Sequence, residues 1–393
     1  MKKLGDLFHF INGRGFKKTE WKENGLPIIR IQNLNDSKAE FNYYQGAYDK
    51  KIEINNGDLL FSWSGTIGTS FGPHIWNRET GLLNQHIFKL EFKDEIERDY
   101  AYYALKFITE EIEKQVNGAV GLVHITKEKL NQFEIPLPSL HEQQRIVATL
   151  DEAFAAIEKA KANAEQNLKN AKKLFESYLQ GVFENKSYGW ENTQLSKLCL
   201  SDRIITYGVI KLGHEVEGGV PCLRTSNVRW LRIDLTGMKR ISPKLSEEYS
   251  RTILKGGEIL VNVRGTLGGV AVVPNSMRGW NVSREVAVIP IDTKKVDPSF
   301  ISSLIGSVAA QNWLGGVKKG AAYVGINIED LRQLPISFPK MTEQQVIVQK
   351  LDALSAETKK LESIYQAKIK DLGELKKSVL LKAFNGELIE VIA

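Results

Sequence analysis

The segment 135–151 reads IPLPSLHEQQRIVATLD, and the segment 336–352 reads ISFPKMTEQQVIVQKLD, so the chain carries one pattern twice, 201 residues apart. Residues 142–183 align with residues 343–384 without a gap and share 14 identities in 42 pairs. Identity at this density indicates a duplication, and two copies are too few for a solenoid of stacked repeats. We therefore interpret the chain as a module that occurs twice.

The duplication extends upstream of these motifs. PIIRIQN at 27–33 corresponds to PCLRTSN at 221–227, and GDLLFSWSGTIG at 57–68 corresponds to GEILVNVRGTLG at 257–268. A globular segment followed by a helical segment thus occurs twice. The predicted segments are 1–138, 139–185, 186–338 and 339–393.

The two helical segments have the periodicity of long helices. Apolar residues, Leu174 and Leu375 among them, recur at alternating steps of three and four without an internal proline, and Ser139 and Thr342 are the predicted N-caps. Some 42 residues form a rod of about 63 Å. Neither rod can bury its apolar stripe alone, so we expect the two rods to pair. A globular segment lies between them in the chain, which favours an antiparallel pair.

Short runs rich in β-branched and aromatic residues predict strands in both globular segments. These runs are Leu26–Ile31, Asp58–Trp63, His86–Phe92, Glu258–Val263 and Glu285–Ile291. One helix is expected in each segment, near 97–116 and 297–313. The predicted class is α+β, with two globular α/β domains separated by two long antiparallel coiled-coil helices in a pseudo-two-fold internal repeat.

Composition restricts the possible functions only weakly. The net charge of +6 and the pI near 8.9 are compatible with a nucleic-acid partner without requiring one. The two cysteines, Cys199 and Cys222, form no CxxC pair, which is typical of a reduced cytoplasmic protein. No apolar run is long enough to cross a membrane, so no membrane partner is expected.

Motifs of catalysis are missing from the sequence. It contains no phosphate-binding loop, and its histidines lack metal-ligand spacing. Ser62-Trp-Ser64-Gly65 resembles a nucleophile motif loosely, but the second copy reads Asn262-Val-Arg264-Gly265 and has no serine there. These observations favour a binding protein over an enzyme and predict no metal site.

Several of these motifs together resemble the specificity (S) subunit of type I restriction-modification enzymes. They are the Pro-x-x-x-Glu-Gln-Gln openers Pro138–Gln144 and Pro339–Gln345, the stretches Tyr207–Lys211 and Gly219–Arg224, and the Gly-Thr-x-Gly stretches at 65–68 and 265–268. The resemblance spans the whole chain. It implies two target-recognition domains that read the halves of an asymmetric double-stranded DNA site.

The resemblance also implies partners. The paired helices would serve as spacer and as docking surface for two methyltransferase subunits, which bind S-adenosylmethionine and flip the target adenine. A restriction subunit would add cleavage where one is present. The chain itself would carry no cofactor and no catalytic residue.

Long polar side chains in loops are the candidates for DNA contact, because Arg and Lys suit guanine and Asn and Gln suit adenine. In the first copy they are Arg14, Lys17, Lys18, Arg30, Gln32, Asn33, Ser64, Thr66, Asn84, Gln85 and His86. In the second copy they are Tyr207, Lys211, Arg224, Ser226, Asn227, Arg264, Thr266, Arg284, Lys318 and Lys319.

Each candidate has a structural alternative. Arg30 and Arg224 recur at equivalent places and so suit a structural role, and Asn33 and Asn227 suit turns. The lysines suit phosphate or water as well as bases. The candidates for docking are Gln143, Gln144, Phe154, Phe175, Leu179, Gln344 and Gln345, and the glutamines suit contacts with the other long helix equally well.

Two other functions remain open at this point. One is a coiled-coil scaffold, or a regulatory DNA-binding protein, without a methyltransferase partner. The divergence between the loops of the two copies argues against a scaffold, which gains nothing from it. The other is an enzyme with an unrecognised site, which methylation by the purified chain alone would reveal.

Overall fold

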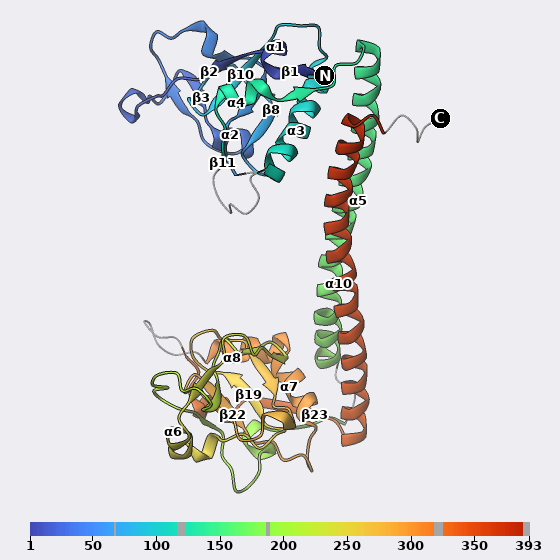
Figure 1. Cartoon of the computed structure of the whole chain (residues 1–393). Helices are drawn as coiled ribbons and strands as arrows, with labels where there is room; N and C mark the ends of the chain where they lie inside the picture. Colours follow the sequence, from blue (N-terminus) through green and yellow to red (C-terminus); the bar gives the residue numbers. More distant parts are fainter. Residues whose placement is uncertain (67, 116–122, 186–188, 318–324, 388–393) are drawn as a thin grey trace. The chain divides into compact units, whose positions relative to one another are not determined.

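The computed structural model describes residues 1–66, 68–115, 123–185, 189–317 and 325–387 (Figure 1). Internal contacts divide the chain into two units. Unit 1 comprises Met1–Ala164 and Ala367–Ala393, and unit 2 comprises Glu165–Gln366. This division differs from the four predicted segments, because each long helix contributes one half to each unit.

Unit 1 contains two four-stranded sheets and one long covering helix. The antiparallel sheet has the order β2 (Phe8–Asn12), β10 (Ile87–Phe92), β6 (Leu59–Ser62) and β8 (Gly72–Ile75). The second sheet has the order β4 (Asn42–Tyr44), β3 (Leu26–Ile29), β9 (Gly81–Leu83) and β5 (Glu53–Ile54), with β3 and β9 parallel. Helix α3 (Arg98–Gln115) shares a hydrophobic core with the antiparallel sheet.

The shorter elements of unit 1 connect these layers. They are β1 (Lys2–Lys3), α1 (Leu4–Leu7), η1 (Lys18–Glu20), α2 (Ile31–Asn35), η2 (Lys50–Ile52), β7 (Ser64–Gly65), β11 (Val123–His124), α4 (Lys127–Gln132) and β12 (Glu134–Ile135). Strands β1 and β12 pair with each other, and so do β7 and β11.

Unit 2 repeats this plan. Its antiparallel sheet has the order β14 (Thr206–Tyr207), β22 (Val286–Ile289), β19 (Ile259–Asn262) and β20 (Val270–Val272). Its second sheet has the order β18 (Lys239–Ile241), β15 (Val220–Leu223) and β21 (Asn281–Val282), with β15 and β21 parallel. Helices α7 (Pro298–Gly306) and α8 (Val308–Gly316) take the place of α3.

The remaining elements of unit 2 are short. They are β13 (Glu191–Gln194), η3 (Leu195–Leu198), β16 (Val228–Arg229), β17 (Arg232–Ile233), α6 (Pro243–Glu248), η4 (Ser250–Thr252), η5 (Asn275–Met277), α9 (Ile328–Arg332) and β23 (Pro335–Phe338). Strands β16 and β17 form a hairpin, and β13 pairs with β23.

Each predicted strand run contains an observed strand, because successive strand residues point to opposite faces and both faces are buried. In β6, Phe61 belongs to the core beneath α3, whereas Leu60 belongs to the core of the second sheet. In β19, Ile259 and Leu260 divide between two cores in the same way. The mixed α and β class is confirmed.

The helix expected near 297–313 differs from its counterpart in unit 1. Helix α3 confirms the helix predicted near 97–116, but the second copy is broken into α7 and α8. Ser307 between them has extended backbone angles, φ −68° and ψ 155°, and its hydroxyl accepts a hydrogen bond from the amide of Ala310 at 3.5 Å. This serine caps a new helix rather than continuing the old one.

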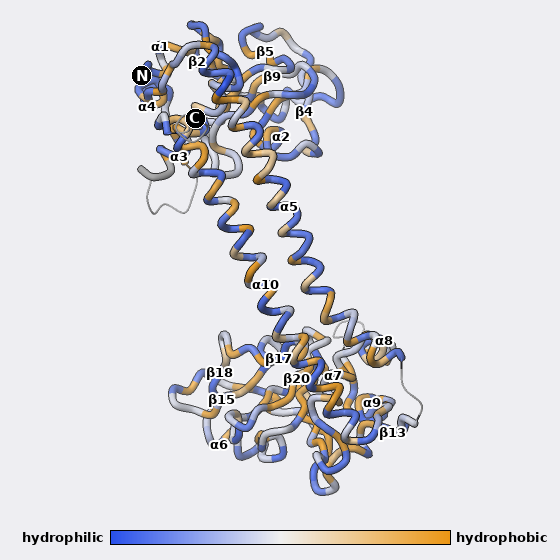
Figure 2. Tube along the Cα trace, turned by 90° about the vertical axis from the view of Figure 1, so that its right-hand side faces the viewer, coloured by the Kyte–Doolittle hydropathy of each residue, from blue (hydrophilic) through white to orange (hydrophobic). Residues whose placement is uncertain are grey.

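The two predicted rods are the continuous helices α5 (Leu140–Glu184) and α10 (Met341–Phe384), along which apolar and polar residues alternate (Figure 2). In unit 1 the first part of α5 packs antiparallel to the last part of α10. There Lys376 pairs with Glu158 at 2.6 Å, and its ammonium lies 5.1 Å from the centre of the Phe154 ring. In unit 2, Leu179 and Leu351 share one core.

Of the two predicted N-caps of these helices, one is observed in the structure and the other is not. Ser139 precedes α5, and its hydroxyl accepts a hydrogen bond from the amide of Glu142 at 3.4 Å, as expected of an N-cap. Thr342 already lies inside α10, which begins at Met341, so its predicted role as a cap is wrong. The carbonyl of Lys340 accepts the first helical hydrogen bonds instead.

In unit 1, helix α3 holds the start of α5 and the end of α10. The side-chain oxygen of Gln143 accepts a hydrogen bond from the amide of Glu97 at 2.8 Å, just before α3. At the end of α10, the Phe384 ring lies 5.3 Å from the Tyr100 ring and 5.4 Å from the Phe107 ring. The two contacts are therefore made by α3 and by the residue just before it.

Unit 2 repeats both anchors at its own helix α7. The side-chain oxygen of Gln344 accepts a hydrogen bond from the amide of Asp297 at 2.8 Å, and the Phe183 ring lies 5.4 Å from the Phe300 ring. Each unit therefore binds the start of one long helix and the end of the other. This arrangement requires the two helices to run antiparallel within each unit.

His74 of β8 makes the stability of unit 1 depend on pH. Burial lowers the pKa of His74 to about 4, whereas a hydrogen bond from its imidazole to the backbone of Ser70 opposes this shift and the charge of Lys106 adds to it. Since the unfolded pKa lies near 6.5, the unfolded chain takes up the proton first as pH falls, and stability decreases between pH 6.5 and 4.

We predict that unit 1 loses about 1 kcal/mol of unfolding free energy between pH 7.5 and 5.5 through this histidine. The variant His74→Gln should lack this part of the pH dependence. Chemical denaturation of both proteins at the two pH values measures the difference. An identical pH dependence in both proteins would contradict the assignment.

In the described part of the chain, the cysteines and the residues that could bind a metal form no recognisable site. Cys199 and Cys222 are free and buried, and burial raises the pKa of each thiol to about 12. Among the described residues, no cluster of His, Cys, Asp and Glu could hold a metal ion. Within the same ranges, no helix has the length and apolar character needed to span a bilayer.

Candidate nucleic-acid interface

Five of the predicted DNA-contacting residues of unit 1 come together in an open cleft of about 310 Å³. The cleft is lined by Phe16, Trp21, Arg30, Ile31, Gln32, Asn84, Gln85, His86 and Ile87. Arg30 and Gln32 follow β3, and Asn84–His86 follow β9. Because β3 and β9 are parallel neighbours, both loops leave the sheet at the same edge.

The cleft presents free polar atoms. The guanidinium of Arg30 lies 5.5 Å from the centre of the Trp21 ring and has no carboxylate partner among the described residues. The indole nitrogen of Trp21 and the Nδ1 atom of His86 are buried and have no hydrogen-bond partner among those residues. Buried polar groups normally have partners, so these atoms suit a ligand that supplies them.

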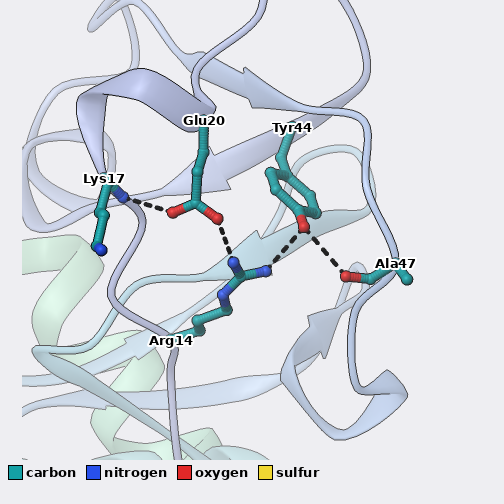
Figure 3. A network of polar contacts seen from close by, with 5 residues as sticks. All are labelled: Arg14, Lys17, Glu20, Tyr44 and Ala47. Carbon is teal, nitrogen blue, oxygen red and sulfur yellow. Dashed lines mark hydrogen bonds and ion pairs between the residues drawn. The ribbon is translucent and has the colours of Figure 1, made fainter.

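The guanidinium of Arg14 lies 4.9 Å from the centre of the Phe16 ring, which lines the cleft, but its polar contacts are made within unit 1 (Figure 3). Its guanidinium forms an ion pair with Glu20 and donates to the hydroxyl of Tyr44 at 2.9 Å. The hydrogen bond with Tyr44, together with the charge of Glu20, raises the pKa of Arg14 against the effect of burial. The backbone amide of Lys17 donates to the same glutamate at 2.8 Å. Arg14 therefore connects Glu20 with Tyr44 and stabilises the segment between them.

Asn33 and Asn227 stabilise turns within their units, which argues against the predicted direct contact with DNA. They are 2% and 0% exposed. In each, the side-chain oxygen accepts a hydrogen bond of 3.0 Å from the amide of the preceding arginine, Arg30 or Arg224. Their amide nitrogens donate to carbonyl groups further along the same loops. The asparagine recurs at equivalent positions because each unit contains the same turn.

Ser64 is buried as well, at 7% exposure, which argues against a direct base contact. Its neighbour Trp63 packs on the core of unit 1, and its ring lies 5.3 Å from the His86 ring and 4.5 Å from the His124 ring. The remaining candidates of unit 1, Lys17, Lys18 and Thr66, have exposed side chains. Their role in DNA contact stays a prediction.

In unit 2 the guanidinium groups differ in their partners. Arg224 donates to the carbonyl of Gly237 at 2.6 Å, and the Nε atom of Arg284 lies 3.5 Å from a carboxylate oxygen of Glu285. The guanidinium of Arg264 lies 5.7 Å from the centre of the exposed Tyr207 ring. The predicted residues Lys211, Ser226 and Thr266 are exposed, and Lys318 and Lys319 lie outside the described residues.

Most of the predicted docking residues make contacts inside the chain, which argues against a direct docking role. Gln143 and Gln344 are 1% and 0% exposed and form the anchors at α3 and α7. Phe154 and Leu179 are buried in the two cores, and Phe175 packs against Trp230. Gln144 and Gln345 are exposed and stay candidates.

The structure shows instead an exposed leucine at the same repeat position of each long helix. Leu174 of α5 lies in unit 2 and Leu375 of α10 lies in unit 1, 201 residues apart, and each is 48% exposed. Both belong to the stripe that the periodicity predicted to be buried. The sequence shows that both repeat positions hold leucine, but two buried leucines would give the same pattern.

The fold repeats one plan of two sheets and a covering helix in each unit, and unit 1 carries a polar cleft. The family model described as type I restriction modification DNA specificity domain matches residues 1–166 and 189–372. The chain therefore belongs to this family, whose members recognise DNA and leave catalysis to other subunits. The family confirms the resemblance found in the motifs.

Individual relatives agree with this assignment. The EcoBI specificity subunit of Escherichia coli is 27% identical over 98% of this chain and 85% of that protein. The MjaVIII specificity subunit of Methanocaldococcus jannaschii is 24% identical over 96% of this chain and 89% of that protein.

Two solved structures share the fold. A chain from a study of complex assembly and conformational transition of the type I R-M system superposes with a TM-score of 0.74 at 16% identity, covering 98% of this chain and 97% of that one. The HsdS subunit of Thermoanaerobacter tengcongensis superposes with a TM-score of 0.61 at 18% identity, covering 98% and 96%.

Proposed function

We propose that each unit reads one half of an asymmetric, bipartite double-stranded DNA target for a type I restriction-modification system. The observation that carries this proposal is one framework with different polar side chains at equivalent positions. The amide of Asn84 donates to the carbonyl of Ile29 at 3.0 Å, and the amide of Ser283 donates to that of Leu223 at 2.8 Å. Positions 84 and 283 are therefore equivalent.

The residues that follow these two positions differ in the groups that they offer to DNA. Gln85 of unit 1 presents an amide, which suits adenine, whereas Arg284 of unit 2 presents a guanidinium, which suits guanine. His86 and Glu285 come next and also differ in charge. Because the two units carry different side chains at equivalent positions, we infer that they recognise different half-sites.

The proposed partners are two copies of a methyltransferase subunit, with a restriction subunit where the system also cleaves. S-adenosylmethionine would be bound by the methyltransferase subunits, and this chain would carry no cofactor. The complex would act in the cytoplasm, where chromosomal DNA is accessible. The exposed leucines supply one candidate docking point in each unit, which supports two copies per chain.

The methylome of the host tests the reading function. Strains with and without this gene are compared in the presence of the methyltransferase subunit. We expect an asymmetric two-part motif with methylated adenine that disappears when the gene is deleted. An unchanged methylome would favour a scaffold or a regulatory DNA-binding protein, and methylation by the purified chain alone would show that it is an enzyme.

Docking has a separate test in the exposed leucines. Leu174→Asp and Leu375→Asp should each reduce binding of one methyltransferase copy at least tenfold, because a buried unpaired carboxylate at the contact is costly. Native mass spectrometry of the co-purified complex should then show one copy for each single variant and none for the double variant. Glu176→Ala, at an exposed position of α5, is the control. Two retained copies in every variant would exclude these positions.

A further inference from the structure

We propose that Arg264 determines specificity in unit 2 by contacting a guanine in the half-site that this unit reads. The inference rests on the proposed reading function and adds the identity of one base. Arg264 lies two residues after the central strand β19, which ends at Asn262, and forms an isolated antiparallel β-bridge with Gly325.

The backbone of this position is tightly held. The amide of Arg264 donates to the carbonyl of Glu285 at 3.3 Å, and the carbonyl of Val263 accepts from the amide of Ile326 at 2.8 Å. Val263 itself is 1% exposed. A side chain on such a backbone starts from a defined position, which direct readout of a base requires.

The guanidinium of Arg264 is positioned by a neighbouring aromatic ring. It lies over the Tyr207 ring, and Tyr207 sits in β14 with 41% of its surface exposed. Among the residues that the structure describes, Arg264 has no carboxylate within ion-pair distance, in contrast to Arg284. Stacking on an aromatic face leaves the in-plane donors of the guanidinium free, and their fork matches the O6 and N7 atoms of guanine.

Comparison of the units separates base contact from phosphate contact. The amide of Trp63 donates to the carbonyl of His86 at 3.2 Å, as that of Val263 donates to Glu285 at 2.9 Å, so Arg264 corresponds to Ser64. The phosphate backbone is the same in every DNA sequence, so residues that contact phosphates should recur in both units. A cation in only one unit instead suits a base that occurs in only one half-site.

The test uses the chain in complex with its methyltransferase subunits and a library of duplexes with randomised half-sites. We expect the wild-type complex to select a G·C pair at one position of one half-site. Arg264→Ala should reduce that preference roughly 10-fold to 100-fold and leave the other half-site unchanged. Arg264→Lys should keep the affinity but lose most of the preference, because an ammonium has no bidentate fork.

Arg251→Ala, which removes an exposed arginine of the same unit outside the candidate site, should leave the whole motif unchanged. The inference is overturned if Arg264→Ala weakens binding to all sequences alike, which would indicate phosphate contact, or if the selected motif stays intact. Absence of any selected motif for the wild-type complex would overturn the proposed reading function, so the two failures are distinguishable.

Discussion

Replacing Glu258 with alanine is expected to lower the free energy of unfolding of unit 2 by about 3 to 5 kcal/mol. Its carboxylate lies 2.7 Å from the guanidinium of Arg203 and accepts a hydrogen bond from the amide of Lys255 at 2.7 Å. The two charged side chains are only 3% and 13% exposed. Removal of the acid leaves a buried arginine without its counter-charge, which is far more costly than losing a surface pair.

Asp58 of unit 1 provides the matched control. It follows the equivalent glycine, accepts from the amide of Asn55 at 2.7 Å, and pairs with Lys89 at 2.9 Å. The Asp58 side chain is 26% exposed, so Asp58→Ala should cost only about 1 kcal/mol. Denaturant titration of both variants, and of the double variant Glu258→Ala/Arg203→Ala, measures the difference. Equal losses in both units would show that charge burial is not the cause.

Phe384→Ala should detach the end of α10 from unit 1 and cost about 3 to 5 kcal/mol. The ring is 7% exposed and packs against Tyr100 and Phe107 in the core of unit 1, so its removal leaves a cavity there. We expect amide hydrogen exchange in the last turns of α10 to rise strongly, while exchange in unit 2 stays unchanged.

Two further variants check this interpretation. Phe183→Ala, the same substitution at the repeat-related position, should loosen the end of α5 in unit 2 in the same way, since Phe183 packs on Phe300. Glu374→Ala, at an exposed position of α10, should change stability by no more than about 0.5 kcal/mol. If hydrogen exchange in α10 is as slow in Phe384→Ala as in the wild type, the aromatic anchor is not what holds the helix.

Some features of this protein follow from the sequence because they depend on local periodicity or on comparison of the chain with itself. The repeated Glu-Gln-Gln motif reveals the duplication, and apolar steps of three and four predict α5 and α10. Alternating apolar runs predict the strands. Connectivity alone favours the antiparallel pairing, because a globular segment separates the helices in the chain.

Other features required the tertiary structure, since they depend on which side chains meet across distant segments. Gln143 is indistinguishable in sequence from a surface glutamine. In the structure it is buried, and it accepts a hydrogen bond from the amide of Glu97, 46 residues away. Leu174 fits the apolar stripe but is exposed, because a stripe defines one face of a helix and packing selects only part of that face.

The candidate site shows the same division. Composition and loop position suggested polar residues for DNA contact, but only the parallel pairing of β3 with β9 brings Arg30 and Gln85 into one cleft. Arg14 forms an ion pair with Glu20, whereas Arg264 has no carboxylate within ion-pair distance among the residues that the structure describes. The sequence by itself determined the duplicated modules and their long helices. Only the folded chain decided which charges remain free, because pairing depends on distances that the sequence does not contain.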